Sequence, residues 1–242
     1  DEKNELLEEL AFLMMPDEEK MSDTSRFFQT EGRKILTASL IAFYHVGMDF
    51  IPIAEKIVRS SWKDLFRAID ETENGKAIQY INSFAGTSEQ NTAGCKQTCD
   101  MALKLFATNE KVKTTIRRPR ANEEEFTSAK IETNNCFVVV DDSKLKLYAP
   151  LLHVIIAQSL EYFSQRSNQN SNTILFCLDE VVSFGKMNIT DALRKLRKKQ
   201  LPTDTDSYDE QGYVQADGSY VHMEKNILKE KGDEPYADSS TK

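Results

Sequence analysis

The sequence predicts a mainly α protein, in which an all-helical bundle domain is followed by a partial α/β unit. Through the first 115 of the 242 residues, apolar side chains recur at three- and four-residue steps, and no alternating, strand-like stretch interrupts them. After residue 116, two β-branched apolar runs flank one more helical pattern. Strand, helix and strand in this order form a βαβ unit, whose two strands are parallel.

These observations divide the chain into three regions. An all-helical domain covers residues 1–118, a partial α/β core covers 119–200, and an acidic tail covers 201–242. In the tail the apolar pattern collapses and Asp and Gly dominate, so we expect it to be largely unstructured. A small hairpin around Asp217-Gly218 is the alternative for part of the tail.

Proline, glycine and polar breaks separate the elements of the helical domain. A first helix is predicted over about residues 1–15, and Pro16 ends it. A long helical pattern follows over about residues 24–46, and Gly47 provides its stop.

Shorter helical patterns complete the domain. Pro52 suits the first turn of the third helix, because the fixed backbone of proline fits that position. Asn74-Gly75 is a strong break between the fourth helix and the fifth. The sixth helix opens where Thr87 stands three residues before Gln90, which is the spacing of a capping box.

Composition excludes some classes of function. A net charge of −8 and an isoelectric point near 5.1 argue against a surface coated with phosphate-binding Lys and Arg. The longest apolar stretch, residues 35–48, contains polar residues and is too short to span a bilayer. We therefore expect a soluble piece, which is compatible with the cytoplasmic part of a membrane-anchored protein. The cysteines lack zinc-site spacing and are predicted to be free thiols: Cys95, Cys99, Cys136 and Cys177.

The two apolar runs are predicted to be strands that are buried on both faces of a parallel sheet. They cover residues 136–140 and 172–178, with a helix over about 145–163 between them. The second run ends abruptly in Asp179-Glu180, at the edge where open α/β sheets bind their ligands. Two acids there suit a Mg²⁺ and nucleotide site. The alternative is a buried strand that leaves the core through a solvated Asp-Glu turn.

Three stretches resemble the type IV secretion coupling proteins, the TraG/TraD-like ATPases that bring relaxase-bound DNA to conjugative channels. Residues 173–187 are similar to the Walker B segment of that family, with a hydrophobic strand, Asp-Glu, a short apolar link and Gly-Lys. Residues 148–158 are similar to the helix before that strand, and residues 99–120 to the last helix of the family's all-helical domain and its exit. With the helical N-terminal half, the resemblance covers about residues 1–199.

The resemblance implies roles in an intact coupling protein with a RecA-like core. Asp179 would bind Mg²⁺ and ATP, and Glu180 would be the catalytic residue that orients the attacking water. The all-helical domain would receive a relaxase or a relaxosome accessory protein, and with it DNA. The parent protein would be a homohexamer anchored in the bacterial inner membrane, in contact with secretion-channel proteins and active in plasmid conjugation.

The sequence departs from that family in an essential part. It contains no G-x-x-x-x-G-K-[ST] loop, so the backbone cradle and the lysine for the β- and γ-phosphates are missing. After Lys199 the acidic tail begins, where the family continues into another core strand. We therefore expect a piece of a coupling protein that holds no ATP or Mg²⁺ and is inactive as an ATPase alone.

Two basic clusters are candidates for nucleic-acid contact. One runs from Arg194 to Lys199 at the end of the last predicted helix. A solvated helix C-terminus is the preferred interpretation of both clusters, because Lys and Arg are favoured there. The other cluster closes the all-helical domain and consists of Lys111, Lys113, Arg117, Arg118 and Arg120.

Three functions therefore remain open. The first is a substrate-receiving domain that recruits relaxase, accessory proteins and DNA. For this domain the negative net charge favours a protein partner, because it repels a polyanion at long range. The second is an ATPase of another architecture with an unrecognised phosphate loop. The third is a plain helical scaffold with no role in nucleic-acid handling.

Overall fold

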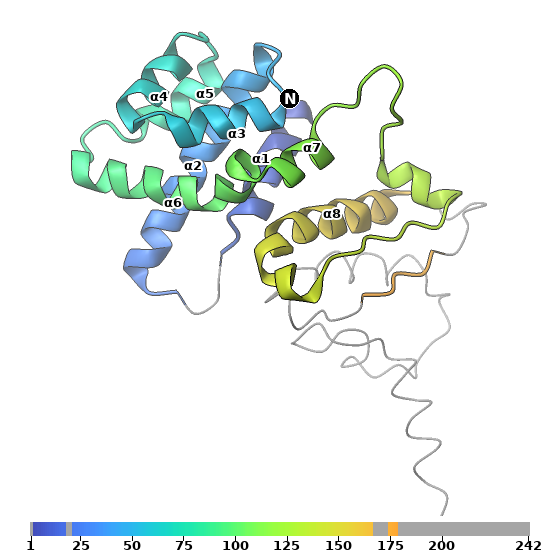
Figure 1. Cartoon of the computed structure of the whole chain (residues 1–242). Coiled ribbons are helices and arrows are strands. Elements are labelled where there is room, and N and C mark those ends of the chain that lie inside the picture. Colours follow the sequence, from blue (N-terminus) through green and yellow to red (C-terminus); the bar gives the residue numbers. More distant parts are fainter. Residues whose placement is uncertain (1, 18–20, 167–173, 179–242) are drawn as a thin grey trace, which may run out of the picture. The chain divides into compact units, whose positions relative to one another are not determined.

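The computed structural model describes residues 2–17, 21–166 and 174–178, and the described part is mainly helical (Figure 1). It falls into two compact units. The first consists of residues up to 127 together with 150–154, and the second of residues 128–149 and those from 155 onward. Within the described residues, no helix combines the length and the hydropathy that crossing a membrane requires.

The described residues of the first unit up to 127 form a bundle of seven helices, and the sequence predicted this helical character correctly. The sequence places the main helices within a few residues of their observed bounds, which is the usual uncertainty of helix ends. The helices are α1 (Glu2–Met14), α2 (Asp23–His45), α3 (Phe50–Arg59), α4 (Trp62–Asp70), α5 (Gly75–Asn82), α6 (Glu89–Thr108) and α7 (Glu110–Ile116).

The predicted stop at Gly47 is confirmed. Gly47 has φ +85°, the left-handed conformation that glycine adopts without steric cost. Its N–H donates to the carbonyl of Tyr44, and the N–H of Met48 donates to the carbonyl of Phe43. This pair of hydrogen bonds is the Schellman arrangement, which satisfies the last carbonyls of α2.

The predicted capping box at the start of α6 is wrong by one residue. The N-cap is Ser88 rather than Thr87, and its side chain accepts a hydrogen bond from the N–H of Asn91 at 3.2 Å. Both residues belong to types favoured at an N-cap, so residue type alone does not separate them. The distinction depends on which residue directly precedes the helix, and that is Ser88, which has extended backbone angles of φ −60° and ψ 145°.

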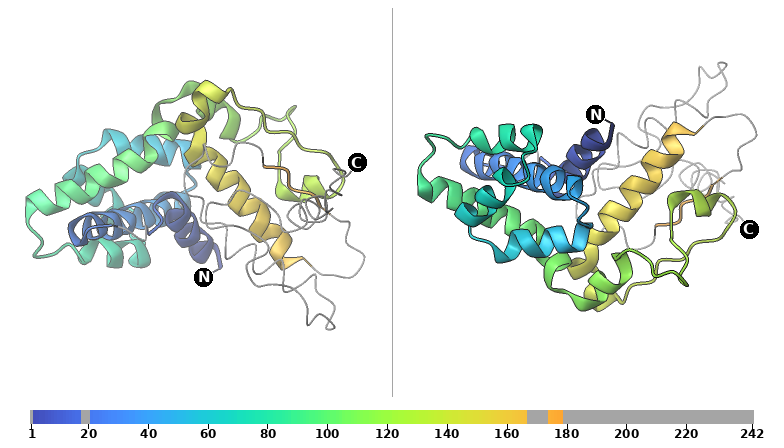
Figure 2. Two further views of the ribbon diagram at one scale, coloured as in Figure 1. Left: turned by 90° about the horizontal axis from the view of Figure 1, so that it is seen from below. Right: turned by 90° about the horizontal axis from the view of Figure 1, so that it is seen from above.

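Helix α2 is the centre of the bundle. Nine consecutive residues, Ile35 to Phe43, are buried, so this part of the helix is covered on every side. The helix packs against α6 and α5 and also against α1 and α3 (Figures 1 and 2). The central polar side chain in this stretch, Ser39, donates its hydroxyl to the carbonyl of Ile35 at 2.8 Å and therefore adds no unsatisfied group to the core.

Helices α2 and α6 approach closely because glycine stands on both. A Cβ atom at Gly32 of α2 would lie 2.8 Å from the carbonyl oxygen of Cys95 and 3.4 Å from the backbone nitrogen of Cys99. A Cβ atom at Gly94 of α6 would lie 2.6 Å from the ring of Phe28. Because glycine has no side chain, these two positions permit close contact between the two helices.

The turn between α4 and α5 holds a strained residue, which leads to a stability prediction. Glu73 has φ +54°, a conformation that costs roughly 1–2 kcal/mol for most L-residues and less for asparagine. We expect Glu73→Asn to raise the free energy of unfolding by about 0.5–1 kcal/mol in urea denaturation. Glu71→Asn is the control, since Glu71 has φ −60° and gains nothing there. Equal effects of the two changes would contradict the strain argument.

The second unit is described for residues 128–149, 155–166 and 174–178. Its main element is α8, which as a whole runs over Leu145–Gln165 and confirms the helix predicted between the two apolar runs. Two short 3₁₀-helices, Ser128–Glu132 and Asp142–Lys144, precede it.

The predicted βαβ unit is not shown by the described residues. Residues 136–140 and 174–178 form no strand there, and Phe137 and Val139 expose 84% and 89% of their surface. A strand forms only when a neighbour completes its hydrogen-bonded ladder, whereas a helix satisfies its backbone internally. The predicted helix near residues 188–199 and the acidic tail lie outside the described residues.

Candidate functional site

The Asp-Glu pair that the sequence singled out, Asp179 and Glu180, lies outside the described residues. The apolar run before it is described from Ile174 to Leu178. Phe176 of that run packs its ring edge-on against Phe163 of α8, with 5.7 Å between the ring centroids. The run therefore contacts the helix that precedes it in the chain.

The basic cluster at the end of the bundle is described completely. Lys111 and Lys113 belong to α7, and Arg117, Arg118 and Arg120 follow directly after it. Helix α7 has seven residues and buries only Val112, so apolar packing holds it weakly. Asn109 begins the helix, since its side chain accepts a hydrogen bond from the N–H of Val112 at 3.1 Å.

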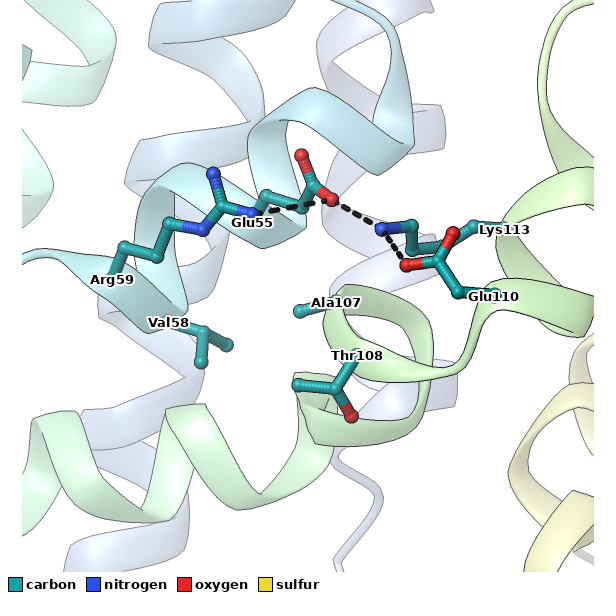
Figure 3. A pocket seen from close by; sticks show the side chains of 7 residues that line it. All are labelled: Glu55, Val58, Arg59, Ala107, Thr108, Glu110 and Lys113. Atoms are coloured by element: carbon teal, nitrogen blue, oxygen red, sulfur yellow. Dashed lines mark hydrogen bonds and ion pairs between the residues drawn. The ribbon is translucent and has the colours of Figure 1, made fainter.

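Lys113 lies between two carboxylates. Its ammonium donates to Glu55 of α3 at 2.7 Å and to Glu110 of α7 at 2.6 Å (Figure 3). These two hydrogen bonds raise the pKa of Lys113. The hydrogen bond from Lys113 also lowers the pKa of Glu55. Arg59 approaches Glu55 at 3.6 Å from the next turn of α3. The charges of this group therefore stabilise one another and connect α3 to α7.

A pocket of about 260 Å³ lies beside this charged group (Figure 3). Its polar lining comes from the four charged side chains just described and from Thr108 at the end of α6, and its apolar lining from Val58 of α3 and Ala107 of α6. The basic groups lining the pocket are balanced by an equal number of carboxylates. The pocket therefore presents no excess of one charge to a small ligand.

Arg117 is held by a carboxylate that follows it in the chain. Its guanidinium makes two hydrogen bonds to Glu123, both of 2.7 Å, and the backbone N–H of Arg120 donates to the same carboxylate at 2.9 Å. The pair is bidentate, which is the strongest form of an arginine–carboxylate contact. It lowers the pKa of Glu123 to about 2.

This pKa gives a pH prediction. Because the folded pKa of Glu123 lies below its ordinary value of 4.5, the Arg117–Glu123 contact stabilises the fold above about pH 4.5 and is lost as the pH falls through about 2. We expect the amide NMR resonance of Arg120, which donates to this carboxylate, to titrate with a midpoint near 2. In Glu123→Gln that transition should vanish. A midpoint near 4.5 in the unaltered chain would show that the contact is absent in solution.

Arg118 reaches back to the beginning of α3. Its guanidinium pairs with Asp49, the N-cap residue of α3, at 2.7 Å. Lys111 and Arg120 are exposed, and neither side chain has an ion-pair partner within 4.0 Å among the described residues. Three of the five predicted nucleic-acid residues are therefore paired with carboxylates, and two present their charge to solvent.

Sequence reasoning missed the acidic partners of this cluster. Asp49 and Glu55 precede Lys113 by more than 50 residues, and the packing of α3 and α7 against α6 brings them there. Glu123 was visible as part of an acidic triplet that follows the basic run. The alternation of basic and acidic residues at that point is the sequence signal for the local pair.

The cysteines differ in exposure, and this difference is testable. Cys95 and Cys99 of α6 are buried, which raises their pKa values to about 11 and about 12, whereas Cys136 and Cys177 are exposed. We expect Ellman's reagent at pH 8 to modify two thiols rapidly and the other two only after unfolding in urea. In Cys136→Ser/Cys177→Ser the rapid phase should disappear. Four equally rapid thiols would contradict the buried positions on α6.

The other predicted basic cluster, Arg194 to Lys199, lies outside the described residues. Within the described part of the chain, no group of three or more His, Cys, Asp or Glu side chains is arranged to hold a metal ion.

One comparison with known proteins gave a match. A family model described as conjugative DNA transfer of the type IV secretory system matches residues 52–199, which is more than half of the chain. The match begins in α3 and continues through the rest of the bundle and α8 to the Asp-Glu pair and beyond it. No curated protein and no solved structure matches the chain.

Proposed function

We propose that this chain, which belongs to the conjugative DNA-transfer family of type IV secretory systems, contributes the substrate-receiving helical domain of a coupling protein. One observation carries the proposal: the family match includes both the helical bundle from α3 onward and the stretch that ends in Asp179-Glu180. In this proposal, the bundle docks a relaxase or a relaxosome accessory protein that is already bound to DNA.

The charge of the chain supports a protein as the first partner. The chain carries a net charge of −8, which disfavours approach of a polyanion from a distance. In addition, Lys113, Arg117 and Arg118 are engaged by carboxylates of the same chain. A DNA-binding protein presents basic surfaces of its own, and an acidic domain attracts such surfaces.

In this proposal, the residues after the bundle belong to the nucleotide-binding core. Residues 136–140 and 172–178 would be parallel strands, adjacent or nearly so, of a RecA-like core, and α8 would be the crossover helix between them. The contact of Phe176 with Phe163 supports this assignment, because a crossover helix packs on the strand that follows it. Asp179 would bind Mg²⁺ and ATP, and Glu180 would orient water, in the complete motor only.

A binding experiment tests the recruiting role. The relaxase encoded by the same conjugative element, free and bound to its origin DNA, is titrated into the chain and followed by isothermal titration calorimetry. We expect saturable binding that weakens as the salt concentration rises from 50 to 200 mM, since charge complementarity contributes to it. The control is a relaxase from an unrelated element. Absence of binding to the relaxase and to the accessory proteins of that element would overturn the proposal.

A second titration addresses the nucleotide. We expect no sub-millimolar binding of Mg-ATP, because the sequence lacks the phosphate loop that supplies most of the contacts to ATP. Binding in that range which is lost in Asp179→Ala would instead establish an autonomous nucleotide site and overturn the assignment of this chain as a motor fragment.

A further inference from the structure

The segment from Glu110 to Arg120 has a strong positive charge of its own. It carries five basic side chains and one acidic one, for a net charge of +4 over eleven residues. Such a density of charge in a short segment suits the phosphate backbone of a nucleic acid. The chain as a whole has the opposite sign, with a net charge of −8.

Three carboxylates from outside this segment cover its charge. Asp49 pairs with Arg118 at 2.7 Å, Glu55 pairs with Lys113 at 2.7 Å, and Glu123 makes the bidentate contact with Arg117. With these three included, the net charge of the group falls to +1. The carboxylates occupy the positions on the guanidinium and ammonium groups that phosphate oxygens would otherwise take.

Ion pairs, more than apolar packing, attach this segment to the rest of the bundle. Only Val112 of α7 is buried, at 2% exposure. Of the three masking pairs, Arg118–Asp49 is the most exposed, with side chains 74% and 39% exposed. The side chains of Arg117–Glu123 are 29% and 38% exposed, and those of Lys113–Glu55 are 18% and 23% exposed. Exposed ion pairs contribute little to stability and weaken with competing charge. A polyanion that approaches closely therefore competes most easily for Arg118, and replacing the other two carboxylates disturbs no core side chain of α7 other than Val112.

We propose that residues 110–120 form a nucleic-acid-binding segment whose charge is masked by Asp49, Glu55 and Glu123. In the masked state, the segment offers Lys111 and Arg120 to solvent and binds DNA weakly. When phosphates replace the carboxylates, Arg117 and Arg118 join the contact, while Lys113 keeps its ion pair with Glu110 of the same helix. The inference rests on the proposed function for its setting and deepens it, because DNA brought by a docked partner meets the segment at high local concentration.

Neutralising the mask should raise the affinity for DNA. The probes are a fluorescein-labelled 20-nucleotide single strand and a 20-base-pair duplex, titrated with the whole chain by fluorescence anisotropy at 50, 100 and 200 mM NaCl. The unmasked variant is Asp49→Asn/Glu55→Gln/Glu123→Gln. Its matched control, Asp70→Asn/Glu71→Gln/Glu73→Gln, makes the same change in net charge at exposed residues that have no ion pair among the described residues.

We expect the unmasked variant to bind at least about 10-fold more tightly at 50 mM NaCl than the matched control. Two freed arginines should also steepen the slope of log affinity against log salt by about 2 on the duplex and about 1.4 on the single strand. Equal affinities of the two variants would overturn the proposal, since the gain would then reflect net charge alone.

Two further variants test whether the gain in affinity depends on Arg117 and Arg118 and not on a change of fold. Arg117→Gln/Arg118→Gln, added to the unmasked variant, should return the affinity to that of the matched control. A gain that persists there would locate the binding elsewhere and overturn the proposal. Asp49→Asn alone should give a smaller gain, which Arg118→Gln cancels. Asp49 makes no side-chain cap hydrogen bond and asparagine is an equally good N-cap residue, so α3 should be unaffected.

These measurements contain only the chain and DNA, whereas the recruiting role is tested with a relaxase. Failure of the relaxase titration with success of the DNA titration would leave a masked DNA-binding segment in a protein that has another partner. The reverse result would leave a partner-binding bundle whose ion pairs only hold α7 in place.

Discussion

Gly32→Ala is expected to destabilise the bundle by about 2 kcal/mol. Its new Cβ atom would lie 2.8 Å from the carbonyl oxygen of Cys95, 3.1 Å from Cε of Met15 and 3.4 Å from the backbone nitrogen of Cys99. Two of these three atoms belong to the backbone of α6, so the whole helix must shift, and overpacking of this kind costs about 1–3 kcal/mol. The loss should exceed the gain of up to about 1 kcal/mol that alanine brings to an exposed helix.

The measurement is urea unfolding followed by the fluorescence of Trp62. The chain has one tryptophan, and it lies on α4 in the bundle, so its signal reports on this unit alone. Gly75→Ala is the matched control, because no atom lies within 4 Å of a Cβ there and its φ is not in the left-handed region. A Gly32→Ala variant as stable as Gly75→Ala would show that α2 and α6 do not approach closely in solution.

Arg33→Ala should release the end of α1 from the bundle, at a cost of about 2–3 kcal/mol. Arg33 is only 14% exposed, donates to the carbonyl of Met15 at 3.0 Å and pairs with Asp17 at 2.7 Å. Its guanidinium also lies 4.5 Å from the ring centroid of Phe12. The hydrogen bond to Met15 contributes about 1.5–3 kcal/mol and the cation–π contact about 0.5–1 kcal/mol, whereas the pair with Asp17 adds little because Asp17 is 54% exposed.

Hydrogen exchange monitored by mass spectrometry distinguishes local release from global unfolding. In Arg33→Ala, we expect faster exchange in α1 and nearly unchanged exchange in α6. Arg33→Lys should be intermediate, because lysine keeps the charge but loses the planar fork that reaches two acceptors. Arg26→Ala is the control on the same helix, since Arg26 is exposed. Unchanged exchange of α1 in Arg33→Ala would contradict this role.

Much of the helical architecture was predictable, because helices are specified locally. The stop of α2 at Gly47 follows from the conformational freedom of glycine, and the break before α5 follows from Asn74, whose side chain caps the N–H of Ala77. The strand predicted over residues 136–140 had strong β-propensity, yet the described residues form no ladder there. Propensity describes how well a residue fits a sheet, and the sheet itself requires neighbours.

The candidate site, too, was predictable only in part from the sequence. The sequence identified the basic residues of the cluster, because five of them occur within ten positions from Lys111 to Arg120. It gave no sign that Lys113 meets Glu55, which lies 58 positions earlier. The role of the catalytic candidates Asp179 and Glu180 stays a prediction, since they lie outside the described residues.

By itself, the sequence determined most of the helices of the bundle and roughly where they end, and it indicated the conjugative family through the apolar run before Asp179-Glu180. These signals are local in the chain, because backbone hydrogen bonds in helices and caps join residues three or four positions apart. Only the tertiary structure decided that α2 and α6 meet at Gly32 and that α3 supplies carboxylates to the basic cluster. Contacts between residues far apart in the sequence depend on how the helices pack, and no local pattern encodes that.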